Sequence, residues 1–264
     1  MGEIKVRDVT ESNIEDVFRV CSHGRLDDPL QMEGIDMRRH WLRGMIQEYG
    51  GCVKIAYLDD RPVAHLLFYP EEAAQFLPAP RRGVVLLRCV YNPFEEARGK
   101  GASTALVKSL IAECRSSPKY LKGEECSFIA SEPFNTGEGT PMEKFYVANG
   151  FTRRGDEMIY EVNGRYIPPK KPAWNPAHAN RGAATVIYNP ACEYSYVSAT
   201  RVREAILGLY PDLPVWLIDQ WKKPEASLSL ANQWLVVKGT PITSSLRDRD
   251  AFDREVRRAV EAAG

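Results

Sequence analysis

The chain has 264 residues, which is enough for one large domain or two modest ones. Hydrophobic residues make up 44% and charged residues 27%, typical of a globular protein with substantial cores. Its 35 basic residues balance its 35 acidic ones, so nothing draws the whole chain to nucleic acid. No run of about 18 apolar residues predicts a membrane span. The charged start lacks the apolar stretch of a signal peptide, so we expect a cytoplasmic protein.

The six cysteines and four histidines show no spacing that is typical of a metal site or a disulfide framework. The cysteines are scattered along the chain without a CxxC pair. We therefore expect reduced thiols and no bound metal.

The first 70 residues predict a strand, two helices and a hairpin. Residues 3–8 alternate between apolar and charged, which predicts a strand. Ser12 followed by Glu15 has the spacing of a capping box at the start of a helix. A second helical pattern covers about 35–48. Two strand-like runs are joined by an Asp/Pro turn at 59–62, which indicates an antiparallel hairpin.

The next segment alternates strands with helices. The near-continuous apolar run 83–91 predicts a central strand, and apolar spacing from 102 to about 115 predicts a helix. A strand at 127–131, a helix at 141–150 with proline at its first turn, and a strand at 157–162 follow.

A proline-rich stretch at 166–183 separates this pattern from a new one, so we expect domains at 1–165 and 184–264 with a linker between them. The second half predicts a strand, a helix, a strand, a connector, a hairpin and a closing helix. These elements are expected at 184–189, around 202–209, 215–219, 234–245 and 252–260.

The stretch after the central strand has the chemistry of an anion site. The strand leads into Arg98, Gly99, Lys100 and Gly101, and a helix starts directly behind them. Free N–H groups at a helix start, with glycines that allow close approach, suit a pyrophosphate. The spacing is neither that of a Walker loop nor that of a Rossmann fingerprint.

This stretch resembles motif A of the GNAT acetyltransferases, [QR]xxGx[GA], which reads here Arg98-x-x-Gly101-x-Ser103. The last position departs from the motif, because Ser103 stands where the family has glycine or alanine. The resemblance implies acetyl-CoA as the cofactor. It implies that backbone groups near Cys89, Val90 and Tyr91 hold the pantetheine arm. It further implies that Arg98, Gly99, Lys100, Gly101, Ala102 and Ser103 hold the pyrophosphate.

A second match strengthens the first. The run from Phe145 and Tyr146 to Gly150 and Phe151 resembles the FYxxxGF of GNAT motif B. There the tyrosine commonly protonates the leaving thiolate, which implies this role for Tyr146. The resemblance covers about residues 3–162. It implies an α/β (α+β) fold with a mixed, mostly antiparallel sheet that is splayed open at the cofactor.

The resemblance implies transfer of an acetyl group to a primary amine by direct attack. Glu132 is a candidate base that could act through water, although a solvated carboxylate is the commoner reading. The acceptor is expected to be a polar small molecule or peptide, bound by the segments 12–47 and 132–140, with neither nucleic acid nor membrane as partner. The alternative is a non-catalytic acyl-CoA-binding or regulatory module.

The second half resembles a thioredoxin-like domain of the kind that follows a GNAT domain in YoaP-like proteins. Cys192 falls where thioredoxins keep CxxC, at a helix start that would stabilise its thiolate. Ser195 replaces the second cysteine, and the cis-proline expected before the third strand is missing. A packing or substrate-shaping role and a thiol-dependent function centred on Cys192 both remain open.

Overall fold

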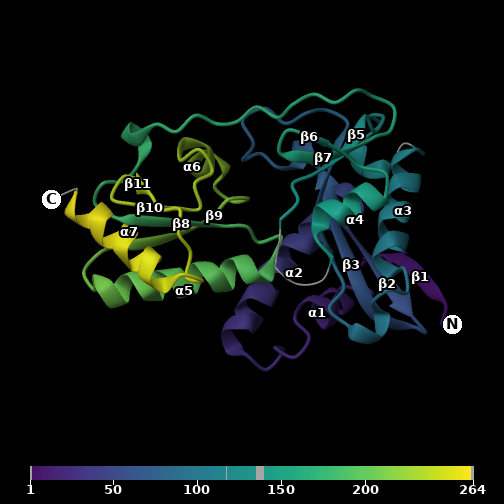
Figure 1. Ribbon diagram of the computed structural model, residues 1–264, viewed down its shortest axis with the longest axis horizontal. Coiled ribbons are helices and arrows are strands. Elements are labelled where there is room, and N and C mark those ends of the chain that lie inside the picture. The colour runs from purple at the N-terminus through teal and green to yellow at the C-terminus, as the bar shows by residue number, and fades with distance from the viewer. Residues whose placement is uncertain (1, 117, 135–139, 263–264) are drawn as a thin grey trace. The chain divides into compact units, whose positions relative to one another are not determined.

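The computed structural model describes residues 2–116, 118–134 and 140–262, so part of the segment 132–140 lies outside the described residues. The chain divides into two compact units. Unit 1 comprises Met1–Leu26, Arg39–Ala73 and Pro80–Pro169, and unit 2 comprises Asp27–Arg38, Ala74–Ala79 and Lys170–Gly264. Two short pieces from the first half of the sequence therefore group with the second half (Figure 1).

Unit 1 is built on a seven-stranded mixed sheet, and the sequence predicts six of its strands. The strand order is β1 (Ile4–Asp8), β2 (Val53–Leu58), β3 (Arg61–Pro70), β4 (Val84–Tyr91), β5 (Phe128–Ser131), β7 (Glu157–Glu161) and β6 (Thr152–Arg154). Neighbouring strands are antiparallel except β4 and β5, which are parallel. The β2–β3 turn places Asp59 and Asp60 at positive φ, a conformation that aspartate tolerates in tight hairpins.

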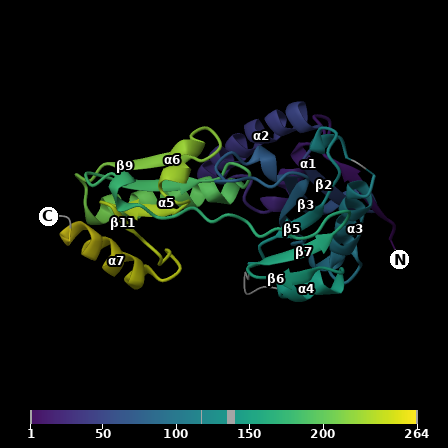
Figure 2. The same cartoon turned by 90° about the horizontal axis from the view of Figure 1, so that it is seen from above.

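Helices cover both faces of this sheet (Figure 2). They are α1 (Glu15–Cys21), α2 (Pro29–Tyr49), α3 (Ala102–Cys114) and α4 (Met142–Ala148). Leu106 of α3 and Tyr146 of α4 share one core with Leu66 and Leu87 of the sheet. On the opposite face, Cys21 of α1 contacts His65, which alternates with Leu66 along β3.

The pairing of β4 with β5 stops early, and this opens the sheet. Val84–Leu86 pair with Phe128–Ala130, whereas the pairing of β4 with β3 continues to Tyr91. From Leu87 onward, no strand among the described residues therefore pairs with the β5-facing edge of β4. Leu67 pairs with Cys89 and Phe68 with Leu87, so Arg88 is the extra residue of a β-bulge at this point.

Unit 2 holds a four-stranded sheet in the order β11 (Thr240–Pro241), β10 (Leu235–Val237), β8 (Ala184–Tyr188) and β9 (Val215–Asp219). β8 and β9 are parallel, and the other pairs are antiparallel. Helices α5 (Glu193–Leu209), α6 (Pro224–Ser229) and α7 (Arg249–Glu261) complete it. The element order is the one that the sequence predicts, with α6 in the connector.

Segment 27–38, which includes the first half of α2, packs within unit 2. Arg38 and Glu193 form a buried ion pair, with 2.6 Å between Nη1 and Oε2. Gly34 lies so close to α5 that an added Cβ would stand 2.6 Å from the Glu193 carbonyl oxygen.

The structure departs from the sequence analysis in four elements. The capping box predicted at Ser12 is wrong, because α1 starts at Glu15 after Ile14 and has no side-chain cap. α2 begins at Pro29 rather than near residue 35. The short elements β6 and α6 were not expected. Four 3-10 helices lie at Glu71–Ala73, Glu95–Ala97, Lys119–Leu121 and Pro176–His178, the last within the expected linker.

The mixed α/β fold class that the sequence predicts is confirmed. Across the described ranges, none of the helices has both the length and the apolar character that crossing a bilayer requires.

Candidate functional site

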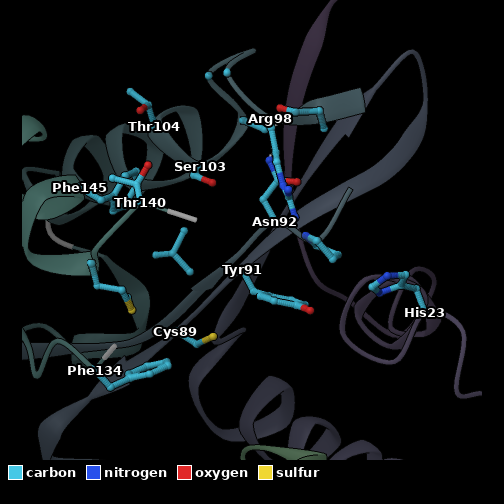
Figure 3. Close-up of a pocket in the computed structure, with 17 residues that line it drawn as sticks. His23, Cys89, Tyr91, Asn92, Arg98, Ser103, Thr104, Phe134, Thr140 and Phe145 are labelled. Carbon is cyan, nitrogen blue, oxygen red and sulfur yellow. Dashed lines mark hydrogen bonds between the residues drawn. The ribbon is translucent and has the colours of Figure 1, made fainter. Parts of the chain in front are cut away.

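A cavity of about 640 Å³ in unit 1 lies between the end of β4, beyond its last pair with β5, and the start of α3. Eight of the nine residues predicted to hold the cofactor line it: Cys89, Val90, Tyr91, Arg98, Gly99, Gly101, Ala102 and Ser103. Figure 3 shows Arg98, Ser103 and Thr104 toward one end of this cavity and Cys89 and Phe134 toward the other. One end is therefore basic and polar, and the other is mostly apolar.

The polar end is formed by the start of α3. Gly101 is the N-cap residue and makes no side-chain cap, so the first N–H groups of α3 keep their hydrogen-bonding capacity. Gly99 and Gly101 have φ values of +71° and +86°, which few other residues adopt without strain. Nothing lies within 4 Å of a Cβ built on either glycine, so their flanks are open. Backbone donors at such a helix start suit an anion.

The two basic side chains of the loop differ. Arg98 lines the cavity, is more than half exposed, and lies 3.7 Å from the Glu95 carboxylate. Such a long, exposed ion pair contributes little free energy, so breaking it when a stronger anion binds costs little. Lys100 is exposed and is not among the residues that line the cavity, and its contact with a pyrophosphate stays a prediction.

Tyr146 lies at the buried side of the site. Its side chain is fully buried in α4 and is not among the residues that line the cavity. Ser131 Oγ, at the end of β5, donates a hydrogen bond of 2.9 Å to the Tyr146 oxygen, and this bond does not use the phenol's own proton. Burial raises the pKa of Tyr146 well above its usual value, and the nearby Cys89 raises it further. The phenol is thus a protonated donor at neutral pH.

Glu132, the candidate base, directly follows Ser131 at the end of β5. Its carboxylate is 62% exposed, lies 3.7 Å from the Arg88 guanidinium, and is not part of the cavity lining. Sequence reasoning places Glu132 near the gap between β4 and β5 but does not find Arg88.

Several other cavity residues were also missed: His23, Asn92, Thr104, Phe134, Thr140 and Phe145. Asn92 Nδ2 donates to the Ala97 carbonyl at 3.3 Å and so braces the loop between β4 and α3. The His23 ring packs on Phe94 with 4.9 Å between centroids. Phe145 belongs to the FY pair of motif B and Thr104 lies in the first turn of α3, whereas the others come from loops and have no spacing signal.

In unit 2, Cys192 is the N-cap residue of α5 and its side chain is exposed. The expectation of a stabilised thiolate is wrong in direction. Desolvation by the surrounding chain raises the pKa of the Cys192 thiol, and Glu193 raises it further. Arg38 and the N–H groups of Tyr194 and Ser195 only partly oppose this. Ser195 Oγ accepts a hydrogen bond from the Asn189 N–H at 2.9 Å, so this side chain stabilises the loop before α5.

Comparisons with known proteins find no matching protein-family model and no match among curated proteins. Solved structures do match. A GNAT family acetyltransferase from Brucella melitensis in complex with acetyl-CoA has 14% identity and a TM-score of 0.41, over 64% of this chain and 94% of that one. An aminoglycoside acetyltransferase in complex with coenzyme A has 16% identity and a TM-score of 0.45, over 60% and 95%. An N-acetyltransferase from Staphylococcus aureus has 13% identity and a TM-score of 0.43, over 61% and 99%.

Proposed function

We propose that this protein is a GNAT-type N-acetyltransferase that moves an acetyl group from acetyl-CoA to a primary amine. The observation that carries the proposal is the cavity that runs from the uncapped start of α3 to the gap between β4 and β5. Its anion-binding end and its apolar end fit a cofactor with phosphates at one end and a thioester at the other.

The residues fit such a cofactor chemically. The N–H groups at the start of α3 bind phosphate oxygens, and Arg98 adds positive charge beside them. Backbone groups of β4 beyond Leu86 have no partner on β5 and can hydrogen-bond the amides of an extended pantetheine arm. Ala102 and Ser103 are small and let the phosphates come close.

Acetyl-CoA would supply an acetyl thioester at the gap between β4 and β5. A backbone N–H on the free edge of β4 stabilises the negative charge that develops on the carbonyl oxygen when the amine attacks. The Tyr146 hydroxyl donates its proton to the departing sulfur, and Ser131 keeps the phenol in place. Holding both reactants at contact supplies much of the rate gain. Glu132 is exposed and can take the proton of the amine through water.

A non-catalytic acyl-CoA-binding module is the second candidate, and one observation favours it. Tyr146 is buried behind the cavity wall rather than in it, so it must gain access to the sulfur when the cofactor binds. A thiol-dependent function at Cys192 is less favoured, because Ser195 stands where a CxxC pair would have its second cysteine.

The test is a turnover assay with acetyl-CoA and a panel of amines: amino acids, a polyamine, aminoglycosides and peptides. Release of the CoA thiol together with an acetylated product, seen by mass spectrometry, is the expected result. Binding of acetyl-CoA without turnover on any amine would favour the non-catalytic module. Activity that alkylation of Cys192 abolishes, while CoA still binds, would favour the thiol-dependent function.

A further inference from the structure

Arg88 has an unusual position in the sheet. It is the extra residue of the β-bulge in β4, next to Cys89, which lines the cavity. It stands just past the last pair between β4 and β5, so its backbone lies at the mouth of the gap. Bulges re-aim side chains beside functional sites more often than elsewhere in sheets.

The residues beside Arg88 on β3 and β4 belong to both faces of the sheet. Leu87 and Phe68 belong to the core that contains α3, whereas the neighbouring Tyr69 packs against Trp41 of α2. Among the groups that raise the pKa of Arg88, Tyr69 has the largest effect. Glu132, Tyr146 and Glu157 raise it further. Cys89 and Arg88 act on the pKa of Tyr146 in opposite directions, Cys89 raising it and Arg88 lowering it. An amine that approaches from the side of Arg88 would meet the thioester across this gap.

Within the part of the chain that the structure describes, no hydrogen bond engages the Arg88 guanidinium. Its one ion-pair contact there is Glu132 at 3.7 Å, which is beyond hydrogen-bond distance, and about a third of its side chain is exposed. The guanidinium, a planar fork of N–H donors, therefore keeps donors available for a ligand at the gap.

Arg81 is an arginine with a structural role, and two carboxylates accept its hydrogen bonds. One of them, Glu157, also acts on Arg88. Arg81 Nε donates to both oxygens of Glu71, and its Nη atoms donate to both oxygens of Glu157. Nη1 also donates to the Ile167 carbonyl at 2.7 Å. Glu157 also accepts a hydrogen bond from Tyr166, so it has little capacity left for Arg88.

We propose that Arg88 and Glu132 form the acceptor-binding pair of this enzyme, and that the acceptor is a free amino acid. The inference rests on the proposed acetyltransferase function. A planar guanidinium binds a carboxylate through two parallel hydrogen bonds, which an ammonium group or an amide cannot match. The Glu132 carboxylate complements the ammonium group of the same ligand. A zwitterion would replace the loose 3.7 Å pair with two tighter contacts and hold its amine at the gap between β4 and β5.

The experiment compares each standard amino acid with its carboxamide, and with spermidine, as acceptors for the full-length protein with acetyl-CoA. The carboxamide keeps the amine but lacks the carboxylate. We expect kcat/KM to be at least about tenfold higher for the acid than for the amide, mainly through KM. Arg88→Gln should abolish this difference, Arg88→Lys should restore part of it, and neither should change the KM for acetyl-CoA.

The matched control is Arg82→Gln, because Arg82 is also a partly exposed arginine paired with glutamates, Glu72 and Glu124. It should leave the preference for the acid intact. Equal rates for acid and amide, a preference that survives in Arg88→Gln, or turnover of spermidine but of no amino acid would each overturn the assignment while leaving the acetyltransferase standing. A folded protein that binds neither CoA nor acetyl-CoA would instead overturn the function itself, and this inference with it.

Discussion

The Tyr146 hydroxyl meets one requirement of a proton donor, because burial raises its pKa and keeps the phenol protonated. Ser131 donates to its oxygen, so the proton is available for another acceptor. The same hydrogen bond gives the hydroxyl a structural role. A substitution must therefore separate loss of chemistry from loss of stability.

Tyr146→Phe should lower kcat by about a hundredfold or more while leaving the Kd for acetyl-CoA nearly unchanged. It should also cost about 1–3 kcal/mol of unfolding free energy, since the Ser131 hydroxyl loses its acceptor in a buried site. Steady-state kinetics and urea denaturation measure the two effects. Because the pKa of Tyr146 is raised, deprotonation of this phenol should not lower the wild-type kcat below a pH of about 10.

Tyr160→Phe is the matched control, because its ring packs on Phe151 as that of Tyr146 does, but its hydroxyl accepts a hydrogen bond from Arg115. It should keep full activity. Equal kcat values for the two variants would remove Tyr146 from the mechanism.

At the scale of elements, the start of α3 and the diverging edge of β4 make the site. Gly101 caps α3 in a left-handed conformation, and the helix offers its first N–H groups because no side chain caps it. The space around Gly101 is open, so an added Cβ would contact no neighbouring atom. It would still strain the backbone, because the φ of Gly101 is positive.

Gly101→Ala should cost about 1–2 kcal/mol of stability and weaken CoA binding severalfold, because the loop relaxes away from the geometry that aims these N–H groups. Gly123→Ala is the control. Gly123 has a φ of +92° and equally open surroundings, but it does not line the cavity. It should lose similar stability and keep its affinity for CoA. If both variants bind CoA as the wild type does, the α3 loop is not the anion site.

Most elements could be predicted from the sequence because their apolar periodicity is strong. The central strand, the α3 helix and the second half of the chain follow this pattern. β6 could not be predicted, because its three residues are all exposed and carry no alternation. The first turns of α2 were missed because they pack within unit 2, a tertiary effect that local sequence does not encode. Ser12 fails as a cap because α1 starts only at Glu15, and the Ser12 hydroxyl is hydrogen-bonded with the Thr10 hydroxyl instead.

The candidate site was partly predictable for a similar reason. The glycine-rich loop and the β4 residues are contiguous and have a recognisable pattern, and the structure brings eight of them to one cavity. Their binding role stays a prediction. Arg88 was not found because its importance comes from a bulge and from the lack of a hydrogen-bond partner among the described residues, neither of which a sequence displays.

At the scale of the whole molecule, the two units share α2. Its residues up to Arg38 group with unit 2, and the rest group with unit 1. Two glycines on this one helix test that division, because their surroundings differ. Gly34 packs against the Glu193 carbonyl oxygen and Val197 of α5, whereas Gly44 has nothing within 4 Å of an added Cβ.

Gly34→Ala should lower the unfolding free energy, because its Cβ would stand 2.6 Å from a backbone oxygen that cannot easily move. Gly44→Ala should raise it by up to about 1 kcal/mol, since alanine is the better helix former. Urea denaturation of both variants gives the comparison. Equal stabilisation by the two substitutions would mean that α2 and α5 do not pack in this way in solution.

The central claim is that the cavity beside α3 binds acetyl-CoA, and calorimetric titration tests it most directly. CoA and acetyl-CoA are titrated into the wild type, into Arg98→Ala, and into Arg82→Ala as a surface control outside the cavity. The account predicts a Kd in roughly the micromolar range, weakened about tenfold by Arg98→Ala and unchanged in the control. No binding of either ligand to a protein that circular dichroism shows to be folded would contradict the account.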